Sequence, residues 1–262
     1  MTALAGVLGH PVAHSRSPAM HNAAYADLGL DWRYVKLPVP PELFEETVRA
    51  LPASGYRGAN VTIPHKVAAL GLADSATEAA RGSGAANTLT FTAEGAIEAD
   101  NTDASGFLDA LEHDPEGARA VILGAGGAAR AVAWALREAF AAEVAVWNRT
   151  PERAIALADE LKLTPVELFD PQDYDLLVNA TSIGLDAADS EADLPLTGAP
   201  PGTVVDLVYS ARGTTPVIEW ASRGGVRTID GLEILVRQGA RSFEIWTGHA
   251  PSLEVMRTAA LG

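Results

Sequence analysis

The stretch that decides the fold is Ala120-Val121-Ile122-Leu123-Gly124-Ala125-Gly126-Gly127-Ala128-Ala129. A short apolar run, typical of a buried strand, leads here into a glycine-rich turn and then an alanine-rich helix. The spacing Gly124-x-Gly126-x-x-Ala129 between a strand and a helix indicates a dinucleotide-binding turn. Gly124 permits the tight turn, and Gly126 lets the backbone approach a pyrophosphate at the helix N-terminus. A glycine-rich turn without a ligand is the alternative.

The next predicted strand indicates which dinucleotide would bind. It spans 143–147 and ends in Asn148-Arg149-Thr150, with Arg153 one turn further along. Sites for NAD usually place an Asp or Glu at this strand end, where it binds the ribose hydroxyls. A guanidinium instead binds a 2′-phosphate, which a carboxylate would repel. The sequence therefore favours NADP over NAD, against the alternative that Arg149 is a solvated surface arginine.

Strand and helix patterns alternate on both sides of this turn, which predicts an α/β fold with a largely parallel sheet. A hairpin over 87–91 and 96–99 would turn at Glu94-Gly95, and a domain change fits near 103–114. Further strands are predicted at 3–8, 34–39, 59–63, 176–180, 204–208 and 226–229. Further helices are predicted at 18–28, 41–51, 66–72, 151–161 with Thr150 as N-cap, 214–222, 233–246 and 253–261.

Composition limits the classes of function. The 262 residues carry a formal net charge of −15, which disfavours nucleic acid and anionic membranes as partners. The sequence holds no cysteine, which excludes disulfides, zinc–thiolate centres and thiol nucleophiles, and we expect no metal. No stretch is long and apolar enough to span a membrane, so we expect a cytoplasmic protein. A homodimer is compatible with the sequence, which does not fix the oligomeric state.

Polar side chains follow several strands of the first half, where α/β sheets place their ligands. Ser15 and Ser17 precede a predicted helix, and their hydroxyls with the helix N–H groups would suit a carboxylate, although capping is the commoner use of such a serine. Asn60 and Thr62 share one face of a strand that leads to Lys66. A lysine and an aspartate such as Asp103 would form an acid/base pair if they converge, whereas a lone lysine is usually a solvated charge.

Taken together, these segments resemble the shikimate dehydrogenase family over nearly the whole chain. The motifs that carry the resemblance are Gly9 to Pro18, Asn60 to Lys66, Gly84 to Thr88, Asn101-Thr102-Asp103, Gly124 to Ala128, Asn148-Arg149-Thr150, Asn179 to Gly184, Asp206 to Tyr209, Asp230-Gly231 and Gln238-Gly239-Ala240. Single pieces would be weak, but the ordered combination is specific.

The resemblance implies an N-terminal α/β substrate domain and a Rossmann-type NADP-binding domain with a cleft between them. The substrate domain would span 1–103 plus 240–262, and the NADP-binding domain 104–239. The expected activity is the reversible NADPH-dependent reduction of 3-dehydroshikimate to shikimate in chorismate and aromatic amino acid biosynthesis. Lys66 would be the proton donor and acceptor, assisted by Asp103. The implied substrate-binding residues are Ser15, Ser17, Asn60, Thr62, Lys66, Asn87, Asp103, Tyr209 and Gln238.

The same resemblance implies a set of cofactor-binding residues. They are Gly124, Ala125, Gly126, Gly127 and Ala128 at the phosphates, Asn148, Arg149, Thr150 and Arg153 at the 2′-phosphate, and Thr181, Leu207 and Gly231 near the nicotinamide. The rival interpretations are an NAD-dependent quinate/shikimate dehydrogenase or an aminoshikimate dehydrogenase, a non-catalytic family member and a folate-linked dehydrogenase. Ser17 and Arg149 count against quinate and NAD, and Lys66 with Asp103 against the non-catalytic alternative.

Overall fold

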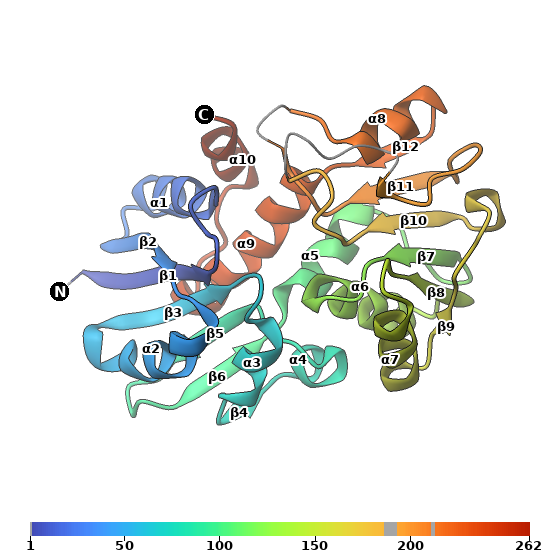
Figure 1. The fold of residues 1–262 in the computed structure, drawn as a ribbon. Helices are drawn as coiled ribbons and strands as arrows, with labels where there is room; N and C mark the ends of the chain where they lie inside the picture. Colours follow the sequence, from blue (N-terminus) through green and yellow to red (C-terminus); the bar gives the residue numbers. More distant parts are fainter. Residues whose placement is uncertain (1, 186–192, 211–212) are drawn as a thin grey trace. The chain divides into compact units, whose positions relative to one another are not determined.

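The computed structural model describes residues 2–185, 193–210 and 213–262, which form two compact units (Figure 1). Unit 1 comprises Met1–Gly106 and Leu235–Gly262, and unit 2 comprises Phe107–Ile234. The chain passes between the units inside α5 (Thr102–Leu111) and α9 (Gly231–Thr247). Within the described residues, no helix combines the length and apolar character needed to cross a membrane.

Unit 1 is built on a mixed sheet in the order β2-β1-β3-β5-β6-β4. Its strands are β1 (Ala3–Gly9), β2 (Trp32–Pro38), β3 (Tyr56–Val61), β4 (Ser75–Ala76), β5 (Thr88–Phe91) and β6 (Ile97–Asp100). The predicted hairpin is confirmed as β5 and β6, which pair antiparallel with Thr88 opposite Asp100. This register brings the segments Asn87-Thr88 and Asn101-Thr102-Asp103 to the same end of the sheet.

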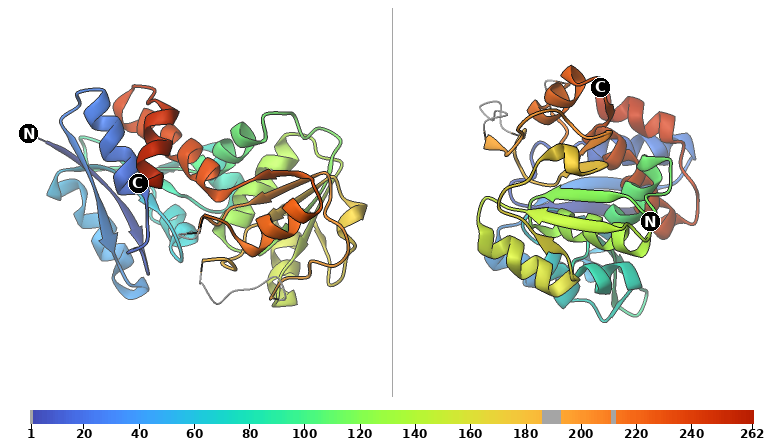
Figure 2. Two further views of the ribbon diagram at one scale, coloured as in Figure 1. Left: turned by 90° about the horizontal axis from the view of Figure 1, so that it is seen from above. Right: turned by 90° about the vertical axis from the view of Figure 1, so that its right-hand side faces the viewer.

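Helices cover both faces of this sheet. One face packs against α2 (Phe44–Ala50), α3 (Lys66–Gly71) and α4 (Glu78–Ser83) through a core that includes Val48, Ala69 and Ala80. The other face carries α1 (Ser17–Asp27), α9 and α10 (Leu253–Leu261), and α1 and α10 lie side by side (Figures 1 and 2). A Cβ on Gly58 of β3 would lie 2.2 Å from Nε1 of Trp246, so α9 presses directly on the sheet.

Unit 2 has a parallel sheet in the order β12-β11-β10-β7-β8-β9, which is the Rossmann arrangement. The elements are β7 (Arg119–Leu123), α6 (Gly127–Glu138), β8 (Glu143–Trp147), α7 (Pro151–Leu161), β9 (Thr164–Pro165), β10 (Leu176–Asn179), β11 (Thr203–Asp206), α8 (Pro216–Arg223) and β12 (Arg227–Ile229). The strand order reverses between β7 and β10, and ligands of such sheets bind outside the strand ends at this switch point. The predicted α/β class with a Rossmann-type unit is therefore confirmed.

Differences from the sequence-based prediction lie in short elements and at the ends of helices and strands; β3, for example, spans Tyr56–Val61 where 59–63 was expected. The strands β4 and β9 and the helix α4 were not predicted, because such short segments show no periodicity. The expected helix 41–51 divides into a 3₁₀ turn, Pro41–Leu43, and α2. Thr150 occupies the N-cap position of α7, but its side chain makes no capping hydrogen bond, so that prediction was wrong for the hydroxyl.

An aromatic cluster fills the space between α1, α9 and the sheet of unit 1. His21 is fully buried and stacks on Tyr34, with ring centroids 4.3 Å apart, beside Tyr25, Phe243 and Trp246. Neither ring nitrogen of His21 has a hydrogen-bond partner among the described residues. Burial lowers the pKa of His21 from 6.5 to about 3, because a charged imidazole would lose its hydration there.

We expect His21 to make the protein acid-sensitive. Unfolded His21 takes up a proton below pH 6.5 and folded His21 does so only near pH 3, so its contribution to stability is complete above pH 6.5 and is lost as the pH falls. The loss between pH 7 and pH 4.5 is roughly 2–3 kcal/mol. Denaturant unfolding of wild type and His21→Leu at both pH values measures it. Equal pH dependence of the two proteins would contradict the expectation.

Candidate active site

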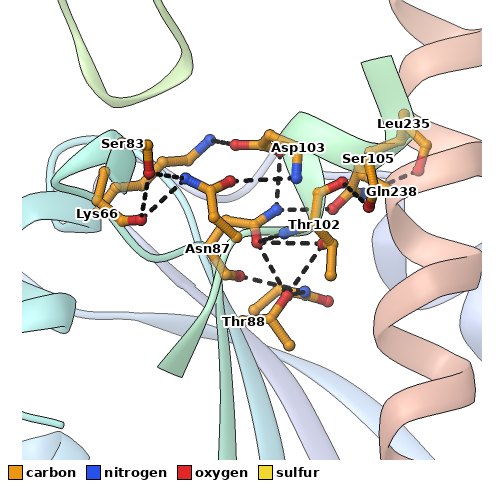
Figure 3. A network of polar contacts seen from close by, with 12 residues as sticks. Lys66, Ser83, Asn87, Thr88, Thr102, Asp103, Ser105, Leu235 and Gln238 are labelled. Carbon is orange, nitrogen blue, oxygen red and sulfur yellow. Dashed lines mark hydrogen bonds and ion pairs between the residues drawn. The ribbon is translucent and has the colours of Figure 1, made fainter. Parts of the chain in front are cut away.

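The centre of the candidate site is an ion pair between Lys66 and Asp103. Lys66 Nζ donates to Asp103 Oδ2, and their side chains are only 13% and 15% exposed (Figure 3). Lys66 is the first residue of α3 and Asp103 the second of α5, and both helices follow strands of the same sheet. The structure thus brings together the lysine and aspartate that the sequence suggested as an acid/base pair, and the pair is not a freely solvated surface contact.

The residue before Lys66 anchors the start of α3. His65 is buried and stacks on Phe44 with ring centroids 4.3 Å apart. Its Nε2 lies 2.7 Å from the carbonyl oxygen of Val39, so Nε2 carries the proton, because a carbonyl only accepts. Burial, the largest influence, lowers the pKa of His65. A neutral His65 therefore holds the backbone from which Lys66 extends.

Asn87 links the ion pair to the sheet. Its Oδ1 accepts from the backbone N–H of Thr102 at 2.7 Å, which fixes the orientation of the amide, because an N–H only donates. Its Nδ2 then donates to Asp103 Oδ1 at 2.8 Å and to Gln238 Oε1 at 3.2 Å. Both amide hydrogens of Asn87 are therefore used, and Asp103 is held by Asn87 on one oxygen and by Lys66 on the other (Figure 3).

The hydroxyls of Thr88 and Thr102 complete this network. Each lies within 3.1 Å of Asn87 Oδ1, and they lie 3.1 Å from each other. Asn60 joins from β3, where its Nδ2 donates to Thr88 Oγ1 at 3.1 Å and its Oδ1 accepts from the hydroxyl of Tyr34 at 2.7 Å. A continuous chain of buried hydrogen bonds therefore runs from Tyr34 to the Asp103 carboxylate.

Helices α5 and α9 meet without an intervening side chain at Gly106. A Cβ at Gly106 would lie 2.7 Å from the backbone nitrogen of Gln238 and 2.8 Å from its Cα. Asp103 stands one turn before Gly106 on α5, and Gln238 faces Asn87 from α9. The close approach of the two helix backbones thus sets the distance between Asp103 and Gln238.

We expect Gly106→Ala to lower both stability and activity, because the methyl group forces α5 and α9 apart. Overpacking of this kind costs about 1–3 kcal/mol. Gly71→Ala is the matched control, because Gly71 also lies in a helix and a Cβ there meets nothing within 4 Å. Thermal unfolding and turnover of both variants test the expectation, and a Gly106→Ala protein as stable and active as the control would contradict it.

The serines of the first turn lie at the N-terminus of α1. Arg16 is the N-cap residue, and the backbone N–H of Ser17 donates to Ser15 Oγ at 3.3 Å. Ser17 itself is the first residue of the helix and is 6% exposed. Ser17 therefore does not cap α1, which was the alternative to a role in binding.

Thr62 lies directly after β3, and its backbone N–H donates to the carbonyl oxygen of Leu8 at 2.8 Å. A Cβ on Gly9 would lie 2.4 Å from the Thr62 methyl group, and His10 N–H donates to the carbonyl oxygen of Ile63 at 3.0 Å. The segment that leads to Ser15 therefore runs against the Thr62 strand end.

The structure divides the predicted substrate residues into two groups. Hydrogen bonds join the members of the first group into one network: Asn60, Asn87, Lys66, Asp103 and Gln238. Ser15, Ser17 and Thr62 lie in unit 1 outside that network, and Tyr209 belongs to unit 2.

The glycine-rich turn of unit 2 has the shape that a pyrophosphate requires. Gly124 has φ +111°, and a Cβ there would lie 2.8 Å from the carbonyl oxygen of Ala180. Gly126 is the N-cap of α6, and a Cβ there would meet no atom of the described residues within 4 Å. Open space thus adjoins the first N–H groups of α6, which have no acceptor one turn earlier in the helix. The residues present fit a dinucleotide phosphate.

Two arginines lie at the end of β8. Arg149 and Arg153 are exposed, and neither forms an ion pair within the part of the chain that the structure describes. Asn148 Nδ2 donates to the carbonyl oxygen of Thr150 at 2.9 Å and so closes the turn between them. The two guanidinium groups are available to a phosphate, as the preference for NADP requires.

A buried carboxylate organises the ends of β10 and β11. Asp206 Oδ1 accepts from Asn179 Nδ2 and from Val208 N–H, each at 2.9 Å, and Oδ2 accepts from the Thr215 hydroxyl at 2.5 Å. Burial raises the pKa of Asp206 to about 6, although these hydrogen bonds favour its charged form. Thr181 is tied to the same group, because its hydroxyl donates to Asn179 Oδ1 at 2.7 Å.

Gly231 meets this group from the start of α9. A Cβ there would lie 2.3 Å from the backbone carbon of Val208 and 2.7 Å from the nitrogen of Tyr209. The backbone N–H of Leu207 donates to the carbonyl oxygen of Asn179 at 2.9 Å, so Thr181, Leu207 and Gly231 lie at one edge of the Rossmann sheet, next to the segment that carries Tyr209. Among the described residues, no group of His, Asp and Glu side chains is suited to hold a metal ion.

Known families match the same segments. The shikimate dehydrogenase substrate binding domain matches residues 7–89, the shikimate/quinate 5-dehydrogenase model 109–194, and the shikimate 5′-dehydrogenase C-terminal domain 231–261. The shikimate dehydrogenase (NADP(+)) of Methanopyrus kandleri is 44% identical over 278 residues, which cover 99% of this chain and 95% of the relative. This chain belongs to the shikimate dehydrogenase family.

Solved structures of similar proteins extend the comparison. Shikimate 5-dehydrogenase from Thermus thermophilus, in complex with NADP(H) and shikimate, matches with a TM-score of 0.87 and 43% identity, covering 99% of this chain and 98% of that one. The ligand-free 5-ketofructose reductase of Gluconobacter sp. strain CHM43 matches with a TM-score of 0.85 and 36% identity over 99% and 98%. Fold alone therefore does not fix the substrate, which must be argued from the site.

Several residues of this shikimate dehydrogenase family member contribute to the site but were not predicted to do so. Besides Thr88, Tyr34 and His65, they include Thr102, which orients Asn87, Gly106, which lets α5 and α9 meet, and Asn101. The Asn101 side chain accepts from the Asp103 backbone N–H at 3.2 Å and donates to Ser83 Oγ at 2.9 Å. The sequence marked Asn101 and Thr102 only as parts of a motif. Their adjacency to Asp103 was the available signal, whereas nothing local marked Gly106.

Proposed function

We propose that the protein is an NADP-dependent shikimate dehydrogenase, which reduces the carbonyl group of 3-dehydroshikimate to the hydroxyl of shikimate and also runs in reverse. This oxidoreductase step belongs to chorismate and aromatic amino acid biosynthesis. The observation that carries the proposal is the largely buried Lys66–Asp103 pair, which Asn87 and Gln238 hold at the end of the unit 1 sheet. The relatives named shikimate dehydrogenase (NADP(+)) give the substrate and cofactor class.

The substrate is assigned to the polar groups by their chemistry. Ser15 and Ser17 at the α1 N-terminus, together with Tyr209, bind the carboxylate, because hydroxyl donors and helix N–H groups favour an anion. Lys66, Asn87, Asp103 and Gln238 bind the ring hydroxyls. Asn60 and Thr62 are assigned to the same substrate, and Asn60 acts largely through its bonds to Thr88 and Tyr34.

Lys66 moves the proton of the reaction. In the reductive direction its Nζ gives a proton to the substrate oxygen while a hydride reaches the carbon, so the carbonyl gains two electrons and becomes a hydroxyl. In the oxidative direction neutral Nζ takes the hydroxyl proton, which a hydroxyl does not release unaided at neutral pH. Asp103 accepts a hydrogen bond from Nζ and orients it. The bond from Asn87 keeps the Asp103 carboxylate in place.

Unit 2 is assigned to NADP, whose nicotinamide supplies or takes up the hydride. The backbone from Gly124 to Ala128 binds the pyrophosphate, and Asn148, Arg149, Thr150 and Arg153 bind the 2′-phosphate. Thr181, Leu207 and Gly231 flank the nicotinamide end. This assignment makes unit 1, Met1–Gly106 with Leu235–Gly262, the substrate domain and unit 2, Phe107–Ile234, the NADP-binding domain, a few residues away from the expected bounds of 1–103 with 240–262 and 104–239. We also propose a cytoplasmic location and a homodimeric state, which cell fractionation and analytical ultracentrifugation test.

An absorbance assay with purified protein tests the function directly. Shikimate, quinate or buffer is mixed with NADP⁺ or with NAD⁺, and formation of the reduced nicotinamide is followed. We expect fast turnover only with shikimate and NADP⁺. Turnover mainly with quinate and NAD⁺ would reassign Ser17 and Arg149 while keeping the chemistry of Lys66. No turnover with any pair would overturn the proposal and favour a non-catalytic family member.

5-Ketofructose is included in the reductive direction because one structural neighbour is named for it. This sugar has no carboxylate, so the segment Ser15-Arg16-Ser17 at the start of α1, called the serine turn, would lack the anion that we assign to it. We therefore expect reduction of 3-dehydroshikimate to exceed that of 5-ketofructose by orders of magnitude in kcat/KM. Comparable rates would show that the carboxylate is not what the site recognises.

A further inference from the structure

Arg16 connects the serine turn to a helix from the far end of the chain. Its Nη1 donates to the backbone carbonyl oxygen of Ala260 at 2.7 Å. Ala260 lies in the last turn of α10 and is only 4% exposed. The contact joins residues that are 244 positions apart in the sequence, and it is one of the ways in which α1 and α10 are held side by side (Figure 2).

The bond satisfies a group that the helix cannot satisfy itself. The last four carbonyls of an α-helix have no partner within the helix, and a buried carbonyl destabilises the fold if it is left without a hydrogen bond. A cation at a helix C-terminus also interacts favourably with the helix dipole. Arg16 supplies both a donor and a positive charge at the end of α10, so the contact is stronger than a hydrogen bond between neutral groups.

The backbone of Arg16 is at the same time part of the candidate carboxylate site. Its carbonyl accepts the first bonds of α1, from Ala19 N–H at 3.1 Å and Met20 N–H at 3.3 Å. Ser15 and Ser17 stand on either side, joined by the bond between the Ser17 N–H and the Ser15 hydroxyl. Any shift of the Arg16 backbone therefore moves both serine hydroxyls and the first N–H groups of α1 together.

We propose that Arg16 is a positioning residue for substrate binding: through the Ala260 carbonyl it holds the Ser15-Arg16-Ser17 turn where its donors meet the substrate carboxylate. This inference rests on the proposed function, because it takes the serine turn as the carboxylate site. An arginine between two serines would by itself suggest a direct carboxylate ligand. The structure favours the positioning role, because the guanidinium reaches the end of α10.

Steady-state kinetics of Arg16→Gln tests the role. We expect KM for shikimate to rise about 10-fold, equivalent to about 1.4 kcal/mol. Both kcat and KM for NADP⁺ should stay within about 2–3-fold of wild type, because the variant misplaces groups that bind the substrate and leaves the reacting groups in place. Arg16→Lys, which keeps a charged donor, should recover most of the loss. Arg33→Gln is the matched control, because Arg33 is an exposed arginine of the same unit. An unchanged KM in Arg16→Gln overturns the proposal.

A double-mutant cycle separates positioning from direct contact. If Arg16 acts through the serine turn, Arg16→Gln should add little to the rise in KM that Ser17→Ala causes on its own. Independent, multiplying effects would mean that Arg16 contacts the substrate separately, and they would overturn the proposal.

Hydrogen exchange tests the same contact without any substrate. We expect Arg16→Gln to speed amide exchange around residues 15–20 and at the end of α10, and to leave β7 and α6 unchanged. Unchanged exchange around residues 15–20 and at the end of α10 would overturn the positioning role, whatever the activity of Arg16→Gln. If exchange rises locally but wild type does not oxidise shikimate, the contact stands and the proposed function fails.

Discussion

Replacing Lys66 with Ala should lower kcat by about 10³-fold, within the roughly 10²–10⁴-fold range of a positioned acid or base. The reason is that hydride transfer leaves an alkoxide unless the oxygen is protonated in the same step, and among the described residues no other lysine is joined to this network. KM for shikimate should change much less, because Asn87, Asp103 and Gln238 keep their mutual hydrogen bonds. Steady-state kinetics in both directions gives the two constants separately.

Two further variants, Lys66→Met and Asp103→Asn, test whether Lys66 supplies the proton. Lys66→Met keeps the unbranched side chain up to Cε but has no amino group, and it should be as inactive as Lys66→Ala. Asp103→Asn keeps an acceptor for Lys66 but removes the charge, so its loss should be smaller. Near-normal turnover of Lys66→Met, with unfolding that matches wild type, would show that the proton comes from another group.

Replacing both Arg149 and Arg153 with Gln should raise KM for NADP⁺ by roughly 10²-fold or more, because each charge-assisted hydrogen bond to the 2′-phosphate contributes about 1.5–3 kcal/mol. KM for NAD⁺ should change little, because NAD⁺ carries no 2′-phosphate. The NAD⁺ assay is therefore the internal control for folding. Exposure of both side chains means that their replacement should leave the core of unit 2 intact.

We expect the ratio of kcat/KM for NADP⁺ to kcat/KM for NAD⁺ to fall in the double variant. Each single variant should have an intermediate ratio. A parallel loss with both cofactors would mean that the arginines act on the fold and not on the 2′-phosphate. An unchanged ratio would assign the phosphate to other groups.

The Rossmann unit was predictable because its key turn is local. The spacing of Gly124, Gly126 and Ala129 encodes a strand, a turn and a helix in consecutive residues, and the structure has those elements at those positions. The family resemblance identified Lys66, Asp103 and Asn87. Their convergence could not be derived from residue patterns, because it depends on the antiparallel register of β5 and β6 and on α9 returning from late in the chain.

What could not be predicted involves contacts between distant segments. The close meeting of Gly106 with Gln238 and the bond from Arg16 to Ala260 have no signature in the residues around them. The same holds for the burial of His21, whose unpartnered nitrogens depend on what packs from α9. A short stretch of sequence shows the period of its apolar residues and the residue types of its turns. Contacts between distant segments leave no trace in either.

The full use of the Asn87 amide has a consequence for ligand design. Since both of its hydrogens are already donated, to Asp103 and Gln238, a ring hydroxyl that takes one of them exchanges a bond and adds none. The enthalpy gained at Asn87 is then only the difference between the new hydrogen bond and the one it replaces. Calorimetry should therefore show that other contacts, such as those to the carboxylate, contribute most of the binding enthalpy. An inhibitor would gain more from a better anion than from an extra hydroxyl aimed at this amide.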